Sequence, residues 1–178
     1  MKTKAAVQTV AEAPLEVVEL EVPDPAPGQV SVHLISSGIC HSQLHQMENS
    51  TLPRPIVLGH EGTGVITGVG RGVTHVKEGD HAIVTWVPRT PIRGRPDPTP
   101  SGVTYQEEPV HGNVYTWGED VLTSGEYVVP ISHDDPTDVS CLVGCAVLTG
   151  AGAVLNTAKA RPGDSVAVFG VGGVGLSA

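Results

Sequence analysis

The sequence predicts a mainly β fold with some helix, followed by the beginning of an α/β unit. Three observations predict it. The 178 residues include 22 Gly and 15 Pro, which mark many turns, as in a β-rich domain. Hydrophobic residues make up 39% of the chain and aromatic residues only 3%, so the core must be built from Val, Ile, Leu and Ala. Near the C-terminus, an apolar run leads directly into a glycine-rich turn, which is typical of a strand-to-helix connection.

Short segments rich in β-branched residues, with partial alternation of apolar and polar positions, predict the strands. They are residues 4–10, 15–22, 29–35, 62–69, 80–87 and 125–130. Turn sequences separate them, because residues 23–28 hold three prolines that exclude a helix interior, and residues 70–72 and 78–80 are typical of turns. This spacing indicates a small barrel or sandwich.

Residues 88–112 interrupt the strand pattern. Six prolines fall in this stretch, and we expect a long loop, either functional or disordered. Beyond it, residues 138–145 and 146–159 are expected to be helical, and residues 161–164 form a turn into an apolar strand at 165–169.

The predicted strand at 165–169 leads straight into a glycine-rich turn. Gly170, Gly172, Gly173 and Gly175 match the G-x-G-x-x-G pattern, in which the glycines permit a tight turn and close approach of a pyrophosphate to a helix N-terminus. The chain ends at Ala178, so we expect only the start of the following helix. The acidic residue that this pattern places about 20 residues further on has no position in the sequence.

Composition narrows the class of protein. Lys and Arg total 10 against 19 Asp and Glu, a formal net charge of −9, which argues against nucleic acid or an anionic membrane as a partner. The sequence has neither an apolar run of about 18 residues, as a membrane helix requires, nor the apolar region of a secretion signal. Three cysteines fit metal ligation or reduced thiols better than a disulfide framework, and we expect a cytoplasmic protein.

Cysteines and a histidine supply the most informative chemistry. Cys40, His60 and Cys145 offer two thiolates and one imidazole, which are the protein ligands of an open zinc site whose fourth position is left for water or substrate. Such a site performs chemistry on an alcohol or carbonyl oxygen. The alternative is a pair of buried thiols and a core histidine, and Cys141, four residues before Cys145, competes for the same role.

Several motifs together resemble a known family. They are Gly38-Ile39-Cys40-His41-Ser42, Gly59-His60-Glu61-Gly62, Gly79-Asp80, Gly144-Cys145 with Thr149-Gly150, and Val168-Phe169-Gly170-Val171-Gly172-Gly173-Val174-Gly175. Over residues 4–178 their order and spacing resemble the zinc-dependent medium-chain alcohol dehydrogenases. The resemblance implies a GroES-like β-barrel domain in residues 1–150, which carries the catalytic zinc. It also implies an incomplete Rossmann domain in residues 151–178, whose family counterpart binds NAD(P).

The resemblance assigns the zinc ligands and a proton path. It makes Cys40, His60 and Cys145 the metal ligands and leaves Cys141 as a packed thiol. It implies that Ser42 takes the proton of the substrate hydroxyl and passes it to His45. A helix cap is the alternative for Ser42, and an exposed surface histidine is the alternative for His45.

Further positions follow from the same resemblance. Glu61 is expected near the zinc, with a surface charge as the alternative. His41 is expected against the cofactor pyrophosphate, and Thr149 near the nicotinamide, although an ordinary helix threonine is equally compatible. Gly170, Gly172, Gly173 and Gly175 are expected to form the cofactor-binding turn.

Two departures from the family pattern bear on the metal. Gln43 stands where the family commonly has an Asp that accepts a hydrogen bond from the ligand histidine. The amide oxygen can accept the same proton but brings no negative charge, so we expect a somewhat weaker or more electrophilic zinc site. The sequence has no cysteine between Cys40 and Cys141, which excludes a structural Cys₄ zinc and predicts one zinc at most.

The resulting expectation is a zinc-dependent dehydrogenase that transfers hydride between a small alcohol or aldehyde and NAD(P). The alternative is a zinc-binding GroES-like fragment or module without independent dehydrogenase activity, which the short C-terminal unit motivates. Association into a homo-oligomer is left open.

Overall fold

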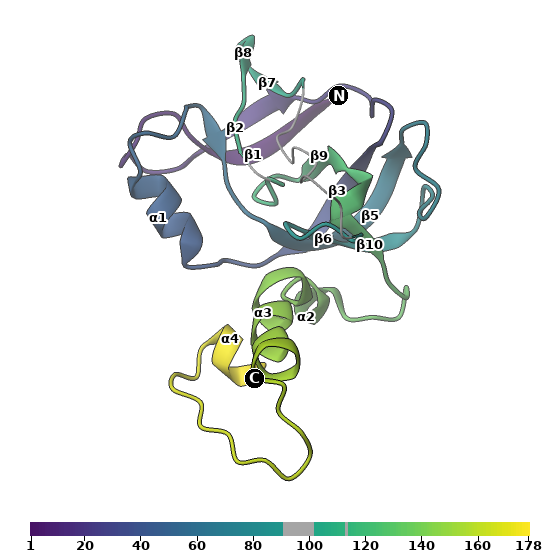
Figure 1. The fold of residues 1–178 in the computed structure, drawn as a ribbon. Helices are drawn as coiled ribbons and strands as arrows, with labels where there is room; N and C mark the ends of the chain where they lie inside the picture. The colour runs from purple at the N-terminus through teal and green to yellow at the C-terminus, as the bar shows by residue number, and fades with distance from the viewer. Residues whose placement is uncertain (91–101, 113) are drawn as a thin grey trace.

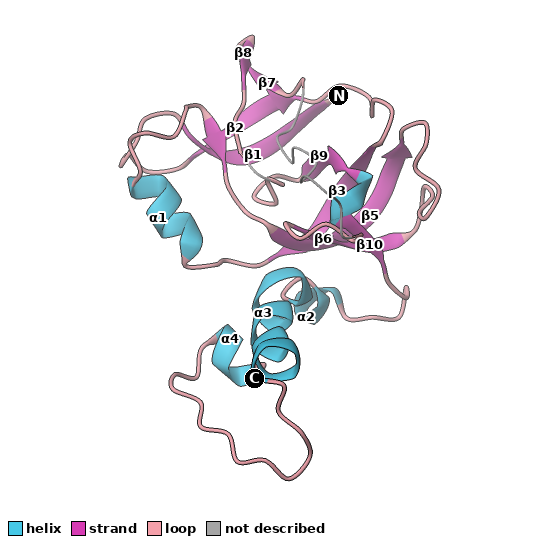
Figure 2. Ribbon diagram, viewed as in Figure 1, coloured by secondary structure: helices cyan, strands magenta, loops and turns pink. Residues whose placement is uncertain are grey.

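The computed structural model describes residues 1–90, 102–112 and 114–178. In these ranges ten strands form two five-stranded sheets. The short helices between residues 137 and 176 lie together at one side of the sheets, whereas the helix Ser42–Glu48 lies apart from them (Figures 1 and 2). The N-terminus lies in the sheet region, while the C-terminus lies among the helices on the opposite side (Figure 1). The prediction of a mainly β fold with some helix is confirmed.

The first sheet has the strand order β4-β1-β2-β7-β8. Its members are β1 (Lys2–Gln8), β2 (Glu16–Glu21), β4 (Ile56–Val57), β7 (Thr104–Tyr105) and β8 (Glu108–Pro109). All neighbouring strands in it are antiparallel. In β1 every second side chain from Thr3 to Val7 is buried, which is the alternation of a strand with one face on the core.

The second sheet has the order β10-β6-β5-β3-β9. Its members are β3 (Gln29–Ser37), β5 (Glu61–Val69), β6 (His81–Thr85), β9 (Asp120–Ser124) and β10 (Val128–Pro130). The pairing of β3 with β5 shifts register twice, as at β-bulges, which bend a strand and help to curve a sheet.

Both sheets contribute to one hydrophobic core. Val7 and Leu20 of the first sheet and Val32 and Leu122 of the second are fully buried in it. Most of the core side chains are valines, as the aliphatic composition predicts, and two buried tyrosines, Tyr115 and Tyr127, complete it. Small β-branched side chains suit this arrangement because they pack closely on pleated surfaces.

The strand predictions in the first 90 residues are confirmed to within about two residues. The segment at 125–130 is strand only at its end, because a 3₁₀ turn, Gly125–Tyr127, precedes β10. In the expected loop at 88–112, residues 91–101 lie outside the described residues, and residues 104–109 form the β7–β8 hairpin. That part of the loop prediction is wrong.

The helical prediction for residues 138–159 is confirmed. This stretch contains α2 (Thr137–Ser140), a π-helical turn at Val143–Val147, α3 (Leu148–Gly152) and a second π-helical turn at Ala153–Ala158. It ends at Lys159, whose φ of 55° is left-handed, as is common at helix ends.

The predicted strand at 165–169 is wrong for the described structure. Residues 165–169 form no strand and pair with none in the described ranges, and Phe169 is 98% exposed. A strand needs a hydrogen-bonded neighbour, which this segment does not have here. The helix expected after the glycines is present as α4 (Gly173–Leu176).

None of the helices within the described ranges is both long and apolar enough to span a bilayer.

Candidate metal centre

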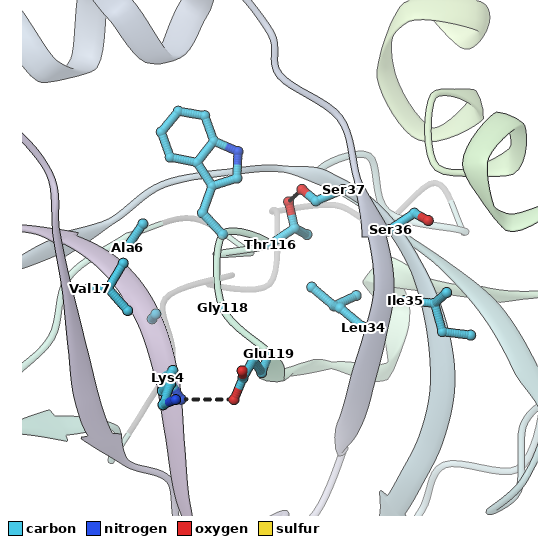
Figure 3. Close-up of a pocket in the computed structure, with 12 residues that line it drawn as sticks. Lys4, Ala6, Val17, Leu34, Ile35, Ser36, Ser37, Thr116, Gly118 and Glu119 are labelled. Atoms are coloured by element: carbon cyan, nitrogen blue, oxygen red, sulfur yellow. Dashed lines mark hydrogen bonds between the residues drawn. The ribbon is translucent and has the colours of Figure 1, made fainter.

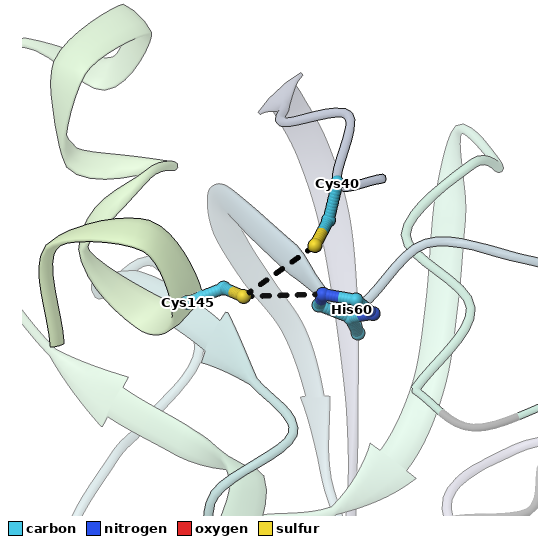
Figure 4. A group of neighbouring side chains, drawn as sticks. All are labelled: Cys40, His60 and Cys145. Atoms are coloured by element: carbon cyan, nitrogen blue, oxygen red, sulfur yellow. Dashed lines mark hydrogen bonds between the residues drawn. The ribbon is translucent and has the colours of Figure 1, made fainter. Parts of the chain in front are cut away.

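Three segments that are distant in sequence bring their side chains together at one point. Cys40 lies in the turn between β3 and α1 (Ser42–Glu48), His60 directly precedes β5, and Cys145 lies in the π-helical turn Val143–Val147. The three side chains point toward one another in Figure 4. His60 Nε2 lies 3.2 Å from Cys145 Sγ, and Cys145 Sγ lies 4.0 Å from Cys40 Sγ.

These distances fit a metal. Tetrahedral zinc with Zn–S of about 2.3 Å and Zn–N of about 2.0–2.1 Å separates its donor atoms by about 3.5–3.8 Å. The three donor atoms of this group all lie within 4.8 Å of one another. Two sulfurs and one imidazole nitrogen are also the donor types that zinc prefers. Among the described residues this is the one such group of His, Cys, Asp or Glu side chains.

Glycine at position 59 allows the backbone turn that places His60 in the group. Gly59 has a φ of +95°, and a Cβ at this position would lie 2.5 Å from the Thr116 hydroxyl and 2.7 Å from the Trp117 backbone nitrogen. A side chain is therefore excluded both by conformation and by space. The backbone conformation therefore requires glycine at position 59, independently of any metal.

Two buried hydrogen bonds connect the segment that carries Cys145 to the second sheet. The Thr85 hydroxyl at the end of β6 donates to the Gly144 carbonyl at 2.6 Å. The hydroxyls of Thr63 on β5 and Ser140 on α2 share a second buried hydrogen bond of 2.9 Å. Because Gly144 immediately precedes Cys145, the first of these bonds restrains the backbone that carries the thiol.

Gln43 connects two of the three candidate ligands. Its side chain is fully buried, and its Oε1 accepts a hydrogen bond of 2.6 Å from the Cys40 backbone N–H. Its Nε2 lies 3.1 Å from His60 Nδ1. The expectation that the amide oxygen accepts the imidazole proton is therefore wrong, because that oxygen is already bound to Cys40.

Burial controls the electrostatics of the group. Desolvation lowers the pKa of His60. The pKa of Cys145 is raised to about 12, mainly by desolvation and further by the nearby Glu61 carboxylate and Cys40 thiol. A hydrogen bond with Trp86 acts on the Cys145 pKa in the opposite direction. A cation at the centre of the group would stabilise the thiolate form of Cys145 and so oppose this rise in its pKa.

Glu61 is buried beside this group. Its side chain is 2% exposed, so the alternative of a surface charge does not hold. Its Oε2 accepts a hydrogen bond of 3.4 Å from the Ala146 backbone N–H, and burial raises its pKa. A carboxylate in this position makes the surroundings of Cys145 more negative.

The other predicted residues of the proton path lie on α1. Ser42 is the first residue of the helix, and its hydroxyl donates to Cys40 Sγ at 3.4 Å. His45 is exposed one turn further along, and its ring lies 5.2 Å from the His41 ring in an edge-to-face arrangement. His41 itself is exposed at the start of the helix.

A cavity of about 400 Å³ opens at the candidate metal centre. Its wall is formed by Cys40, Ser42, Gln46, Leu58, Gly59, His60, Trp86 and Cys145. The Trp86 ring lies 6.4 Å from the His60 ring. Sequence reasoning missed Trp86, Leu58 and Gln46, because a single side chain at the end of a strand or on a short helix has no diagnostic spacing.

A second hollow lies elsewhere on the molecule. This open groove of about 360 Å³ runs between β1, β3 and residues 116–119, and Figure 3 shows its lining. Lys4 and Glu119 are its charged members, joined by a hydrogen bond from the Lys4 backbone N–H to the Glu119 carboxylate. It contains none of the predicted site residues.

Apart from His41, the predicted cofactor residues lie in the C-terminal part of the chain. Thr149 is exposed on α3. Gly170 has a φ of +100°, and a Cβ at Gly175 would lie 1.9 Å from the Gly170 carbonyl oxygen. Gly172 and Gly173 lead into α4. The turn therefore requires glycine at both ends for a conformational and a steric reason.

Comparison with known proteins agrees with this fold. Residues 26–133 match the family described as the alcohol dehydrogenase GroES-like domain. The chain belongs to this family.

Relatives and solved structures match nearly the whole length of this chain. The chain is 37% identical to a putative alcohol dehydrogenase D of Mycobacterium tuberculosis, over 100% of this chain and 54% of that protein. It is 36% identical to an NDMA-dependent alcohol dehydrogenase of Amycolatopsis methanolica, with the same coverage. The crystal structure of benzyl alcohol dehydrogenase from Acinetobacter calcoaceticus matches with a TM-score of 0.86 and 28% identity over 99% of this chain and 54% of that one. The chain thus spans about half the length of the curated relatives it matches.

Proposed function

We propose that this chain forms the zinc-binding part of an alcohol dehydrogenase that transfers hydride between a small alcohol or aldehyde and NAD(P). The observation that carries the proposal is the convergence of Cys40, His60 and Cys145 at the wall of a cavity. Membership in the alcohol dehydrogenase GroES-like family supports it.

The metal, the cofactor and the cavity residues have separate roles in this proposal. When bound, zinc supplies Lewis-acid polarisation of the substrate oxygen, and a nicotinamide cofactor supplies the hydride acceptor or donor. Cys40, His60 and Cys145 would hold the ion. Leu58 and Trp86 line the same cavity, where they bind the carbon part of the substrate and exclude water.

Proton transfer is assigned to α1. Ser42 lines the cavity, so in this proposal its hydroxyl accepts the proton of a substrate hydroxyl and releases its own proton toward His45. The exposed His45 ring, on the same helix, passes that proton to solvent, because an imidazole exchanges protons near neutral pH. Glu61 keeps negative charge close to the donors and so favours a cation there.

The cofactor is assigned to the C-terminal side. In this proposal residues 1–150 form the zinc domain, and residues 151–178 begin the cofactor domain. His41 faces the pyrophosphate and Thr149 the nicotinamide, while the turn from Gly170 to Gly175 leaves its backbone bare for close approach of the phosphates.

A second candidate is a zinc-binding module without dehydrogenase activity of its own. The observation that favours it is that the chain matches 54% of its relatives' length. NADH titration of the chain distinguishes the two candidates. Micromolar binding supports the dehydrogenase, and retention of zinc without any NADH binding supports the module.

The metal itself is tested by elemental analysis of the purified chain and two cysteine variants. We expect one zinc per wild-type chain, loss of zinc in Cys145→Ser, and retention in Cys141→Ser. The second variant is a matched control, because Cys141 is also a buried free thiol but lies outside the donor group. Two zinc ions per chain, or loss of zinc in Cys141→Ser alone, contradicts the ligand assignment.

A further inference from the structure

The hydrogen bonds of Gln43 determine which nitrogen of His60 carries its proton. A backbone N–H is only a donor, so the atom 2.6 Å from the Cys40 nitrogen must be the amide oxygen. The opposite end of the amide, which faces His60 Nδ1 at 3.1 Å, is then the NH₂ group. Because NH₂ is also only a donor, Nδ1 must present its lone pair.

This arrangement places the ring proton at the metal side. A neutral imidazole with a lone pair on Nδ1 carries its hydrogen on Nε2, and His60 Nε2 is the atom that lies 3.2 Å from Cys145 Sγ. A metal bound at Nε2 needs the lone pair there, so the proton must then reside on Nδ1. There it meets the two hydrogens of the Gln43 amide.

Rotation of the amide does not resolve the conflict. Turning it by half a turn gives His60 an acceptor but points the NH₂ group at the Cys40 N–H, over a distance of 2.6 Å. One amide has a single oxygen and so cannot accept from both donors in this geometry. A carboxylate has two oxygens and can accept from Cys40 with one and from His60 with the other.

We infer that Gln43 is a positioning residue that holds metal-free His60 in the Nε2–H tautomer, and so weakens zinc binding relative to a carboxylate at position 43. The inference rests on the proposed zinc site. It goes beyond the loss of a negative charge, because it assigns the weakness to an unmatched hydrogen bond between two donors. Partners of a ligand histidine typically change metal affinity by about 10–100-fold.

The tautomer is measured directly by long-range ¹H–¹⁵N correlations of the histidine rings in the zinc-free wild-type chain. The His60 signals are assigned by their loss in His60→Asn. We expect the Nε2–H tautomer in the wild type and the Nδ1–H tautomer in Gln43→Glu. An Nδ1–H tautomer in the wild type overturns the inference without reference to any variant at position 43.

Zinc affinity is measured by competition with a chelator. We expect Gln43→Glu to bind zinc about 10–100-fold more tightly than the wild type. Gln46→Glu is the matched control, because it adds the same charge on α1 at the same cavity but leaves Gln43 in place. An equal gain in both variants, or none in Gln43→Glu, overturns the inference.

The outcomes also distinguish this inference from the proposed function. If wild type and Cys145→Ser bind zinc equally, the ligand set itself is wrong. If Cys145→Ser loses zinc while Gln43→Glu matches the wild type, only the role of Gln43 is refuted.

Discussion

Replacement of Thr85 by Val tests how the Cys145 segment is held against the barrel. The Thr85 side chain is 5% exposed. Its hydroxyl donates to the Gly144 carbonyl at 2.6 Å and accepts from the Val87 backbone N–H at 3.2 Å. Val keeps the shape of the side chain and removes both bonds, so the buried Gly144 carbonyl and the half-buried Val87 N–H each lose a partner.

The expected magnitude follows from the bond to the Gly144 carbonyl, which is the buried one of the two. Leaving a buried polar group without its partner costs about 1–3 kcal/mol. For a chain of this size each kcal/mol lowers the melting temperature by about 2–4 °C, so we expect Thr85→Val to melt about 2–12 °C lower. We also expect weaker zinc binding, because Gly144 adjoins Cys145 and its position sets that of the thiol.

The assay is thermal unfolding of the zinc-free chain by circular dichroism, followed by a zinc competition titration. Thr123→Val is the matched control. Thr123 is 1% exposed, and its hydroxyl has no hydrogen-bond partner in the part of the chain that the structure describes. Removing it should leave stability unchanged or raise it. Equal melting temperatures for the two variants would refute the reasoning.

The remaining predictions concern stability. Tyr115→Phe removes the buried acceptor of the Leu122 N–H and should lower the free energy of unfolding in urea by about 1–3 kcal/mol; a wild-type value would contradict this. The Lys77 backbone N–H, the largest cause, lowers the pKa of Asp80 from 3.8, so the folded state favours the carboxylate, and its stabilisation is present above that pH and lost as the pH falls further. Asp80→Asn should therefore melt lower than wild type at pH 7, and the gap should close in acid; a gap independent of pH would be inconsistent with this assignment. Zinc at about 100 times its dissociation constant should add about 2.7 kcal/mol to the unfolding free energy, as measured by urea titration, and should add nothing in Cys145→Ser.

The fold was largely predictable because most of its strands show alternating apolar and polar residues in the sequence. Alternation in the first 90 residues reflects one buried face per strand, and this is visible without any tertiary information. The β7–β8 hairpin was missed for two reasons. Its two-residue strands are too short to alternate, and its turn residues Gln106 and Glu107 have positive φ values of 51° and 69°, positions where Gly or Asn usually mark a turn.

The candidate site was predictable in its members but not in its hydrogen bonds. Cys40, His60 and Cys145 were expected to meet, and the structure brings them together. The orientation of the Gln43 amide depends on where the Cys40 N–H points, which only the folded turn defines. The failed strand at 165–169 has the same kind of cause, since pairing requires a neighbouring strand that no local pattern specifies.

The placement of the donor cysteines also has a topological consequence. Cys40 and Cys145 are separated by 105 positions, and a single ion held by both closes the intervening chain into a ring. In the chain-entropy treatment of crosslinks, a ring of about 100 residues restricts the unfolded ensemble by on the order of 4–5 kcal/mol. The ion would thus crosslink the two-sheet region to the helical segment that follows it, as a reversible counterpart of a covalent crosslink.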